Sequence, residues 1–505
     1  MSLIKRNIIA NFGGKAWQAL MSLAFVPLYI KFMGIESYGL VGIFASLLAL
    51  FGLLDMGLST TLNRELARYS VLPDKARDMR NLVRTLELPY WGMAFAIGIA
   101  VVGLSGPIAY YWVNADNLSP ATVKQALMIM GGVVAFRWPI SLYSGGLMGL
   151  QKQVLLNGIN VFAATLRGVG AVLVLWLISP TIQAFFVWQI FASMVHTTLT
   201  AGFLWRGLPK SGQRSHFQKV LLLRIWRFAA GMTGISVTVI ILTQTDKIVL
   251  SKILPLEMFG YYTLATVVAN ALYYFVGPVF SALFPRFSQL VSVNDQAGLK
   301  DLYHKSCQFI SVMILPAAIV VSFFSSEILL LWTGDPVTVS NTHRIVSILI
   351  IGTALNGLMN LPYGLQLAHA WTKLTLYTNI IASIVLVPMI YFLAIRYGLV
   401  GAASAWVILN TGYVLICIQI MHSRLLKGEK WRWYFNDVAV PLLSALILAT
   451  FWRLLIPSEM SKVAMLICLA CISATTLLAS AFATSVTRQW VNKKLVMLKV
   501  MYGNQ

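Results

Sequence analysis

Apolar segments of about twenty residues, separated by charged or turn-forming residues, follow one another along almost the whole chain. A helix of that length crosses the hydrocarbon core of a membrane, where every backbone polar group must be bonded internally. Hydrophobic residues make up 58% of the 505 residues and charged residues only 11%, which excludes a soluble protein of this size. The sequence predicts an all-α polytopic membrane protein with fourteen transmembrane helices: 9–31, 38–59, 88–112, 123–147, 156–178, 181–205, 228–250, 259–284, 306–332, 344–366, 374–395, 399–421, 438–456 and 463–486.

Basic residues are sorted to one side of this predicted bundle. With the N-terminus in the cytoplasm, cytoplasmic segments hold 27 of the 38 Lys and Arg residues and external segments hold 7. Because Lys and Arg accumulate on the cytoplasmic side of membrane proteins, we expect both termini to lie inside. The net charge of +22 then reflects orientation and contact with anionic lipids, and a nucleic-acid partner is not expected.

A basic segment without acidic residues, 206–227, divides the chain after six spans. We expect an N-terminal six-helix lobe at 1–205, a cytoplasmic linker at 206–227 and a C-terminal six-helix lobe at 228–425. Two additional helices at 438–486 and a basic cytoplasmic tail at 487–505 complete the chain.

The two lobes also repeat one another. A shift of 221 residues aligns KFMGIESYG with KILPLEMFG, which places Lys31 on Lys252, Glu36 on Glu257 and Gly39 on Gly260. Both copies lie at the turn between the first two spans of their lobe. Six spans in each unit give the copies the same orientation, so we expect a pseudo-two-fold axis along the membrane normal, as in transporters with a central site.

The connections between spans carry no recognisable catalytic chemistry. They are short on the external side, and they contain no paired carboxylates, nucleophile motif or phosphate-binding glycine loop. Cys468 and Cys471 form a CxxC without a second ligand pair inside an apolar segment, and the histidines show no metal-ligand spacing. We therefore expect a transporter rather than an enzyme, with no metal and no cofactor.

Several segments resemble one known family. NFGGKAWQAL, FVPLYIKFMGIESYGLVGIF and LLDMGLSTTLNRELARY are similar to the opening helices of the polysaccharide transporter family, which includes the O-antigen (Wzx-type) flippases. QTDKIVLSKILPLEMFGYYTLA, PVFSALFPRFSQL and YGLVGAASAW resemble later helices of that family. The superfamily also holds the lipid II flippase and the multidrug and toxin extrusion antiporters. Many O-antigen flippases end after twelve spans, and the two further helices expected here are also found in the lipid II flippase.

This resemblance implies a function in polysaccharide and lipopolysaccharide assembly at the bacterial inner membrane. The cargo would be an undecaprenyl-pyrophosphate-linked oligosaccharide, such as an O-antigen repeat unit, moved between leaflets by alternating access. The resemblance also implies that transport is coupled to a proton or sodium gradient and that the protein contacts a glycan polymerase.

Ionisable side chains within spans are costly and are functional candidates. Asn11, Lys15 and Gln18 share one face of the first span, where ammonium and amide groups suit an anionic, hydroxyl-rich ligand; the alternative is that Lys15 extends to the interface. Arg137 and Arg167 lie within later spans and can each grip a phosphate with two bonds; alternatively each bonds a helix carbonyl or an acid such as Asp55.

Three further sets of residues are candidates. Asp246 and Lys247 form either a neutral ion pair or, with Asp246 as the ion-coupling group, a switch that frees Lys247 for the substrate. Asn270, Asn356 and Asn360 belong to polar stripes that line a sugar cavity or hold helices together. Arg64 and Glu65 lie at the cytoplasmic end of the second span as an intracellular gate or an anchor.

A multidrug antiporter of the same fold is the main alternative. Such proteins bind cations and would carry acids in the cavity, whereas the charges within spans here are mostly basic. An integral membrane enzyme of glycan assembly is less favoured, because the external loops are too short to hold a catalytic site.

Overall fold

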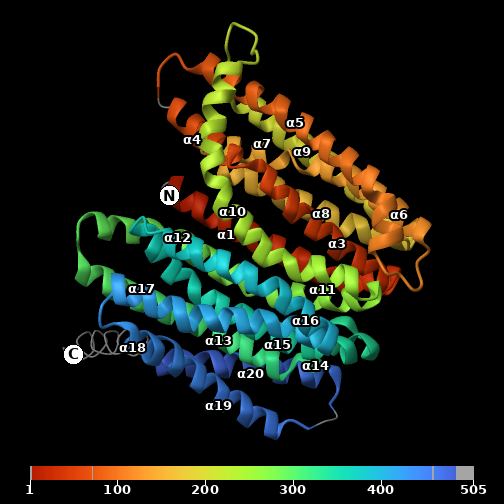
Figure 1. The fold of residues 1–505 in the computed structure, drawn as a ribbon, viewed down its shortest axis with the longest axis vertical. Helices are drawn as coiled ribbons and strands as arrows, with labels where there is room; N and C mark the ends of the chain where they lie inside the picture. Colours follow the sequence, from red (N-terminus) through yellow and green to blue (C-terminus); the bar gives the residue numbers. More distant parts are fainter. Residues whose placement is uncertain (1–2, 71, 458–459, 485–505) are drawn as a thin grey trace, which may run out of the picture. The chain divides into compact units, whose positions relative to one another are not determined.

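The computed structural model describes residues 3–70, 72–457 and 460–484, and these residues form helices without a β-strand. Compact packing divides the chain into two units, residues 1–263 and 264–505, and the helices of both are labelled in Figure 1. The expected boundary at the 206–227 segment remains a prediction. In the structure, this segment contains the end of one helix at Gly207 and the start of the next at Lys219. The basic tail at 487–505 lies outside the described residues.

The first unit contains ten helices and the start of an eleventh: α1 (Leu3–Ala24), α2 (Val26–Met33), α3 (Ile35–Gly52), α4 (Leu58–Tyr69), α5 (Ala76–Pro107), α6 (Pro120–Arg137), α7 (Ile140–Gly149), α8 (Gln153–Leu177), α9 (Ile182–Gly207), α10 (Lys219–Ile253) and α11 (Leu256–Asn270). The second unit continues with α12 (Tyr273–Ser292), α13 (Gln296–Phe323), α14 (Ser325–Thr333), α15 (Pro336–Ala368), α16 (Lys373–Gly412), α17 (Ile418–Leu425), α18 (Lys430–Arg432), α19 (Val440–Leu455) and α20 (Lys462–Ala483). Short 3₁₀ or π turns extend four of them: η1 (Leu53–Asp55), η2 (Ile108–Trp112), η3 (Tyr413–Cys417) and η4 (Trp433–Ala439).

Many of these helices match the spans that the sequence predicts. Among the described residues, eleven helices are long and apolar enough to cross a membrane, or twelve if the bent pair α11 and α12 forms one span. One of the eleven, residues 373–425, is 53 residues long and contains Gly398 with non-helical angles of φ 59° and ψ −141°. Only glycine adopts such angles readily, so the segment holds two helices. With α10 as a further span, the arrangement is compatible with fourteen.

Helices in the first unit approach closely where small residues meet. A Cβ atom on Gly98 of α5 would lie 3.0 Å from the carbonyl oxygen of Gly131 on α6, and one on Gly131 would lie 2.8 Å from that of Gly98. Within a membrane the hydrophobic effect does not drive helices together, so close contact between backbones at small residues helps to stabilise their packing. The same unit packs α6 against α9 and α8 against both α1 and α9.

In the second unit the two additional helices pack on α13 (Figure 1). Ile319 of α13 contacts Ala445 and Ala449 of α19, and Val320 contacts Ile472 of α20. These small and branched residues give a buried apolar interface, so the last two helices pack as part of this unit.

Candidate functional site

Two arginines are held inside the first unit by helix breaks and packing. Arg137 is the last residue of α6, because Trp138 and Pro139 interrupt the helix before α7 begins and a proline cannot supply the next backbone N–H. The indole of Trp138 donates to the carbonyl of Phe51, 3.0 Å away, which fixes the break. Arg167 lies in the middle of α8, and both arginine side chains are half-buried.

These guanidinium groups have no acidic partner. Within the described part of the chain neither Arg137 nor Arg167 forms an ion pair or a hydrogen bond, and Asp55 bonds Ser59 instead, with 2.8 Å between their side-chain oxygens. The two positive charges act on each other. A half-buried cation without a counterion is costly, so this arrangement is suited to an anion that supplies the missing charge.

His196 of α9 lies near both arginines, and we define Arg137, Arg167 and His196 as the cationic cluster, whose positive charge comes from the two guanidinium groups. Both arginine charges act on its ring, and its Nε2 lies 3.1 Å from Oδ1 of Asn160 on α8. Its Nδ1 and the hydroxyl of nearby Ser193 are buried without a partner among the described residues. Because Oδ1 of Asn160 only accepts, Nε2 carries the ring hydrogen and Nδ1 of the uncharged ring is an acceptor, whereas the Ser193 hydroxyl is a buried donor open to a ligand. The histidines show no metal-ligand spacing in the sequence, but the position of His196 within a predicted span is a signal that could have found it.

The polar face expected on the first span is divided by the structure. Asn11 is committed to packing: its Oδ1 accepts from Nδ2 of Asn157 at 2.6 Å and its Nδ2 donates to Gln153 at 3.2 Å. Gln18 donates to the carbonyl of Gly14 in its own helix. Lys15 is exposed and, among the described residues, has no hydrogen-bond or ion-pair partner. Its ammonium is therefore available to a ligand.

Asp246 and Lys247 form an ion pair with 3.2 Å between the nearest charged atoms. Lys247 also donates to the carbonyl of Thr243 at 3.0 Å, and Asp246 accepts from the hydroxyl of Tyr262 at 2.7 Å. Both charged groups are thus satisfied within α10 and α11 in this conformation.

Arg64 and Glu65 form an ion pair 2.9 Å long within α4, and Arg68 approaches the same carboxylate at 3.5 Å. The charged residues predicted to form a gate or an anchor thus lie together on α4.

The asparagines of the second unit are engaged in helix contacts. Asn356 accepts from the hydroxyl of Tyr273 at 2.9 Å and donates to Asn410 at 2.8 Å, which joins three helices. Asn360 donates to the carbonyl of Asn356, and Asn270 is exposed at the end of α11. The structure brings Asn356 and Asn360 together and leaves Asn270 separate from these bonds.

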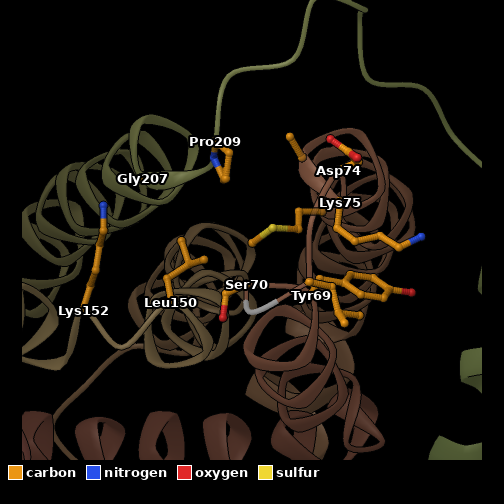
Figure 2. A pocket seen from close by; sticks show the side chains of 11 residues that line it. Tyr69, Ser70, Asp74, Lys75, Leu150, Lys152, Gly207 and Pro209 are labelled. Carbon is orange, nitrogen blue, oxygen red and sulfur yellow. The ribbon is translucent and has the colours of Figure 1, made fainter.

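A hollow of about 400 Å³ lies among the ends of α4, α5, α7 and α9. Figure 2 shows Leu150 and Ser70 facing it, whereas the Lys75 side chain points away. The amine of Lys75 is paired with Asp78 at 2.7 Å, and that of Lys152 lies against Gly207. No inward-facing charge builds an ionic site there.

Metal-ligating residues do not gather anywhere in the described ranges: no group of three His, Cys, Asp or Glu side chains could hold an ion.

The chain matches two known protein families. Residues 4–291, more than half of the chain, match the family described as polysaccharide biosynthesis protein. The chain belongs to this family. Residues 233–392 also match the MatE family. The resemblance seen in the sequence is confirmed, and the chain is a member of the flippase superfamily that holds both families.

Two curated bacterial relatives cover most of the chain. A putative O-antigen transporter of Shigella flexneri is 24% identical over 80% of this chain and 94% of its own length. The lipopolysaccharide biosynthesis protein WzxC of Escherichia coli (strain K12) is 23% identical over 87% of this chain and 86% of its own length.

Solved structures confirm the fold. The lipid II flippase MurJ in an inward closed conformation aligns with a TM-score of 0.68 at 15% identity, covering 97% of this chain and 99% of that chain. An inward-facing multidrug resistance transporter of the MATE family aligns with a TM-score of 0.60 at 12% identity, covering 84% of this chain and 98% of that chain. The Shigella relative is named as a transporter, and the two solved structures as a flippase and a transporter, in agreement with the expectation of a transporter rather than an enzyme.

Proposed function

We propose that this protein is a flippase for a lipid-linked, anionic oligosaccharide in the bacterial inner membrane. The cargo is an undecaprenyl-pyrophosphate-linked glycan repeat unit, and it crosses by alternating access with both termini in the cytoplasm. Support comes from family membership and from the names of the relatives, an O-antigen transporter and a lipopolysaccharide biosynthesis protein.

The cationic cluster carries this proposal. Arg137 and Arg167 lack a counterion within the described chain, and His196 presents an unpartnered ring nitrogen beside them. A pyrophosphate supplies two negative charges and several acceptor oxygens, which match guanidinium groups in charge and geometry. Lys15, exposed on α1, adds a cation on a helix that packs against α8, and Lys247 would join once Asp246 is neutralised.

A multidrug antiporter is the competing function, and the MatE match to residues 233–392 makes it concrete. A cavity for cationic drugs would be expected to offer carboxylates. Arg137 and Arg167 lie within spans of the first unit and have no acidic partner among the described residues, which favours an anion.

Charge-removing variants test the function in cells that lack the natural gene. Arg137→Gln and Arg167→Gln should each lower surface glycan at least tenfold, the effect of losing about 1.4 kcal/mol of binding, while lipid-linked oligosaccharide accumulates on the inner leaflet. Arg137→Lys should retain part of the activity, because the charge remains without the two-bond geometry. Lys124→Gln on α6, outside the cluster, is the matched control.

Drug susceptibility separates the alternatives in the same strains. Normal glycan display together with altered resistance to cationic drugs in cells that lack the gene would reject the flippase. Normal glycan display in stably inserted Arg137→Gln and Arg167→Gln variants would remove the cationic cluster from the substrate site.

Coupling and partners extend the proposal. Asp246, paired with Lys247 and bonded to Tyr262, is the candidate for uptake of a proton or sodium ion. Anionic lipids would contact the basic segments, and glycan polymerase machinery would receive the cargo.

A further inference from the structure

The second unit contains a buried histidine held between two acids. His304 of α13 is 1% exposed at its side chain and Asp437 of η4 is 0% exposed, and Nδ1 of His304 lies 2.5 Å from Oδ2 of Asp437. The other ring nitrogen, Nε2, lies 3.2 Å from Oε2 of Glu429. These residues are 125 and 133 positions from His304 in the sequence, so the contacts join α13 to the start of the additional helices.

Both ring nitrogens face carboxylate oxygens, and this geometry selects a protonation state. A neutral imidazole has one N–H donor and one lone pair, whereas the imidazolium has two donors. Two carboxylates can accept only from N–H groups. While both acids are ionised, both contacts are hydrogen bonds only when the ring carries the additional proton, and such charge-assisted bonds are stronger than neutral ones.

The other groups near the ring are an amide, a second imidazole, a phenol, a thiol and an indole. Gln308 of α13 donates to the second oxygen of Asp437 at 2.9 Å, which holds that carboxylate in place. From α17, Nε2 of His422 lies 3.4 Å from the hydroxyl of Tyr303. Cys307 of α13 and Trp433 of η4 complete the surroundings of Tyr303.

Glu429 connects the buried ring to water. Its side chain is 18% exposed and pairs with Lys300 at 3.0 Å and with Arg432 at 3.6 Å, whose side chains are 38% and 48% exposed. Burial alone would raise the pKa of Glu429, but the hydrogen bond and charge of Lys300 and the other nearby positive charges lower it on balance. A partly exposed carboxylate in contact with a buried histidine gives a proton a route between the ring and the solution.

We propose that His304, Asp437 and Glu429 form a proton-binding site that holds η4, at the start of the additional helices, against α13. A proton from the solution at this end, which the predicted topology places in the cytoplasm, enters through Glu429 and resides on His304. Loss of the proton places a ring lone pair against a carboxylate and leaves the negative charge of Asp437 buried without a counterion, so the contact between η4 and α13 weakens.

The proton can be observed directly. Purified full-length protein with ¹⁵N-labelled histidine is measured by NMR in nanodiscs at pH 8, where an exposed histidine is mostly neutral. One histidine with both ring nitrogens protonated is expected. It should be absent from His304→Gln and retained in His369→Gln, a control in the same unit whose ring bonds only the carbonyl of Leu365 among the described residues.

Stability against pH supplies the second measurement. The thermal midpoint of the natural protein should fall on raising the pH from 7 to 9 by roughly 4 °C more than that of His304→Gln. Glu429→Gln should also reduce this pH dependence, because an amide presents less negative charge to the ring.

Two outcomes would overturn the proposal. A His304 ring that is neutral at pH 8 in the natural protein would show that no proton is held there. An unchanged doubly protonated signal at pH 8 in Asp437→Asn, which removes the buried charge, would show that the acid does not hold it. If His304→Gln fails to insert, Asp437→Asn and Glu429→Gln give the same comparison.

Discussion

Gly39 and Gly260, 221 residues apart, each contact the main chain of the other's helix in an equivalent way. A Cβ atom on Gly39 would lie 2.6 Å from the carbonyl oxygen of Leu256, and one on Gly260 would lie 2.3 Å from the carbonyl oxygen of Ile35. Ile35 and Leu256 are themselves 221 residues apart and each precedes the glycine of its own helix by four residues. The contact is therefore reciprocal about a local two-fold axis, as in an isologous interface.

A second equivalent pair lies one turn further along. Gly42 of α3 faces Thr263 of α11, and a Cβ on Gly42 would lie 2.2 Å from the threonine hydroxyl oxygen. The 221-residue shift also relates these positions. The repeat predicted from the sequence thus corresponds to a symmetric crossing of α3 and the start of α11, at a point where bulk on either glycine would separate the helices.

Adding one methyl group at this crossing tests its importance. Gly39→Ala and Gly260→Ala should each destabilise the purified protein by about 1–3 kcal/mol, because a backbone carbonyl must shift to admit the new atom. The two losses should be similar, since the contacts are equivalent. Gly52→Ala, at the end of α3 with nothing within 4 Å of its Cβ position, is the matched control. Thermal unfolding and surface glycan are measured for each variant. If Gly39→Ala behaved like Gly52→Ala in both, the crossing would be contradicted.

The sequence predicts more of the fold than of the site. The spans can be predicted because the length of an apolar segment and the Lys and Arg residues that flank it are both read from a short stretch of sequence. Arg137 and Arg167 are also recognisable, since a charge within a span is conspicuous. The contact of His304 with Asp437 is not, because it joins residues 133 positions apart and Asp437 lies where a span was expected to begin. Asn11 and Lys15 share the predicted face, but only packing against α8 shows that one is bonded and the other exposed.

Topology can be tested with reporter fusions. Fusions after Gln505 and within residues 206–227 should report the cytoplasm, while fusions at Asn114 and Asp335 should report the exterior. The reason is the division of Lys and Arg between the two sides, 27 against 7. An external C-terminus would require an odd number of spans and contradict the expected fourteen.

Acid should weaken the start of α15. Asp335 caps this helix by accepting from the backbone N–H groups of Val337 and Thr338 at 3.2 and 3.0 Å. The hydrogen bond from the Thr338 hydroxyl lowers the pKa of Asp335 below its ordinary value of 3.8, against a smaller effect of burial and with help from the two backbone N–H groups. Because the folded pKa is depressed, this stabilisation is complete above the ordinary value and is lost as the pH falls through the folded value.

Asp335→Ala should therefore cost about 0.5–2 kcal/mol of stability at pH 7, and the difference from the natural protein should shrink below pH 3.8. Chemical denaturation at several pH values measures it. Ser119→Ala removes an uncharged cap from α6, whose hydroxyl accepts from the N–H of Thr122, so its cost should not depend on pH. A pH-independent cost for Asp335→Ala would show that its charge is immaterial.

Lys15 and Asn11 lie one helical turn apart and should respond to mutation in opposite ways. Asn11→Ala loses its bonds to Asn157 and Gln153 and should cost about 1–3 kcal/mol of stability, with glycan display falling only as protein level falls. Lys15→Ala leaves every described contact intact and should insert at normal levels yet abolish surface glycan, because the ammonium that meets the anionic cargo is gone. Lys15→Arg should keep part of the activity, since the charge persists while its geometry changes.

If the protein instead exported cationic drugs, export would improve when this positive charge is removed. Normal glycan display in a stably inserted Lys15→Ala variant would exclude Lys15 from the substrate site and leave substrate binding to the cationic cluster.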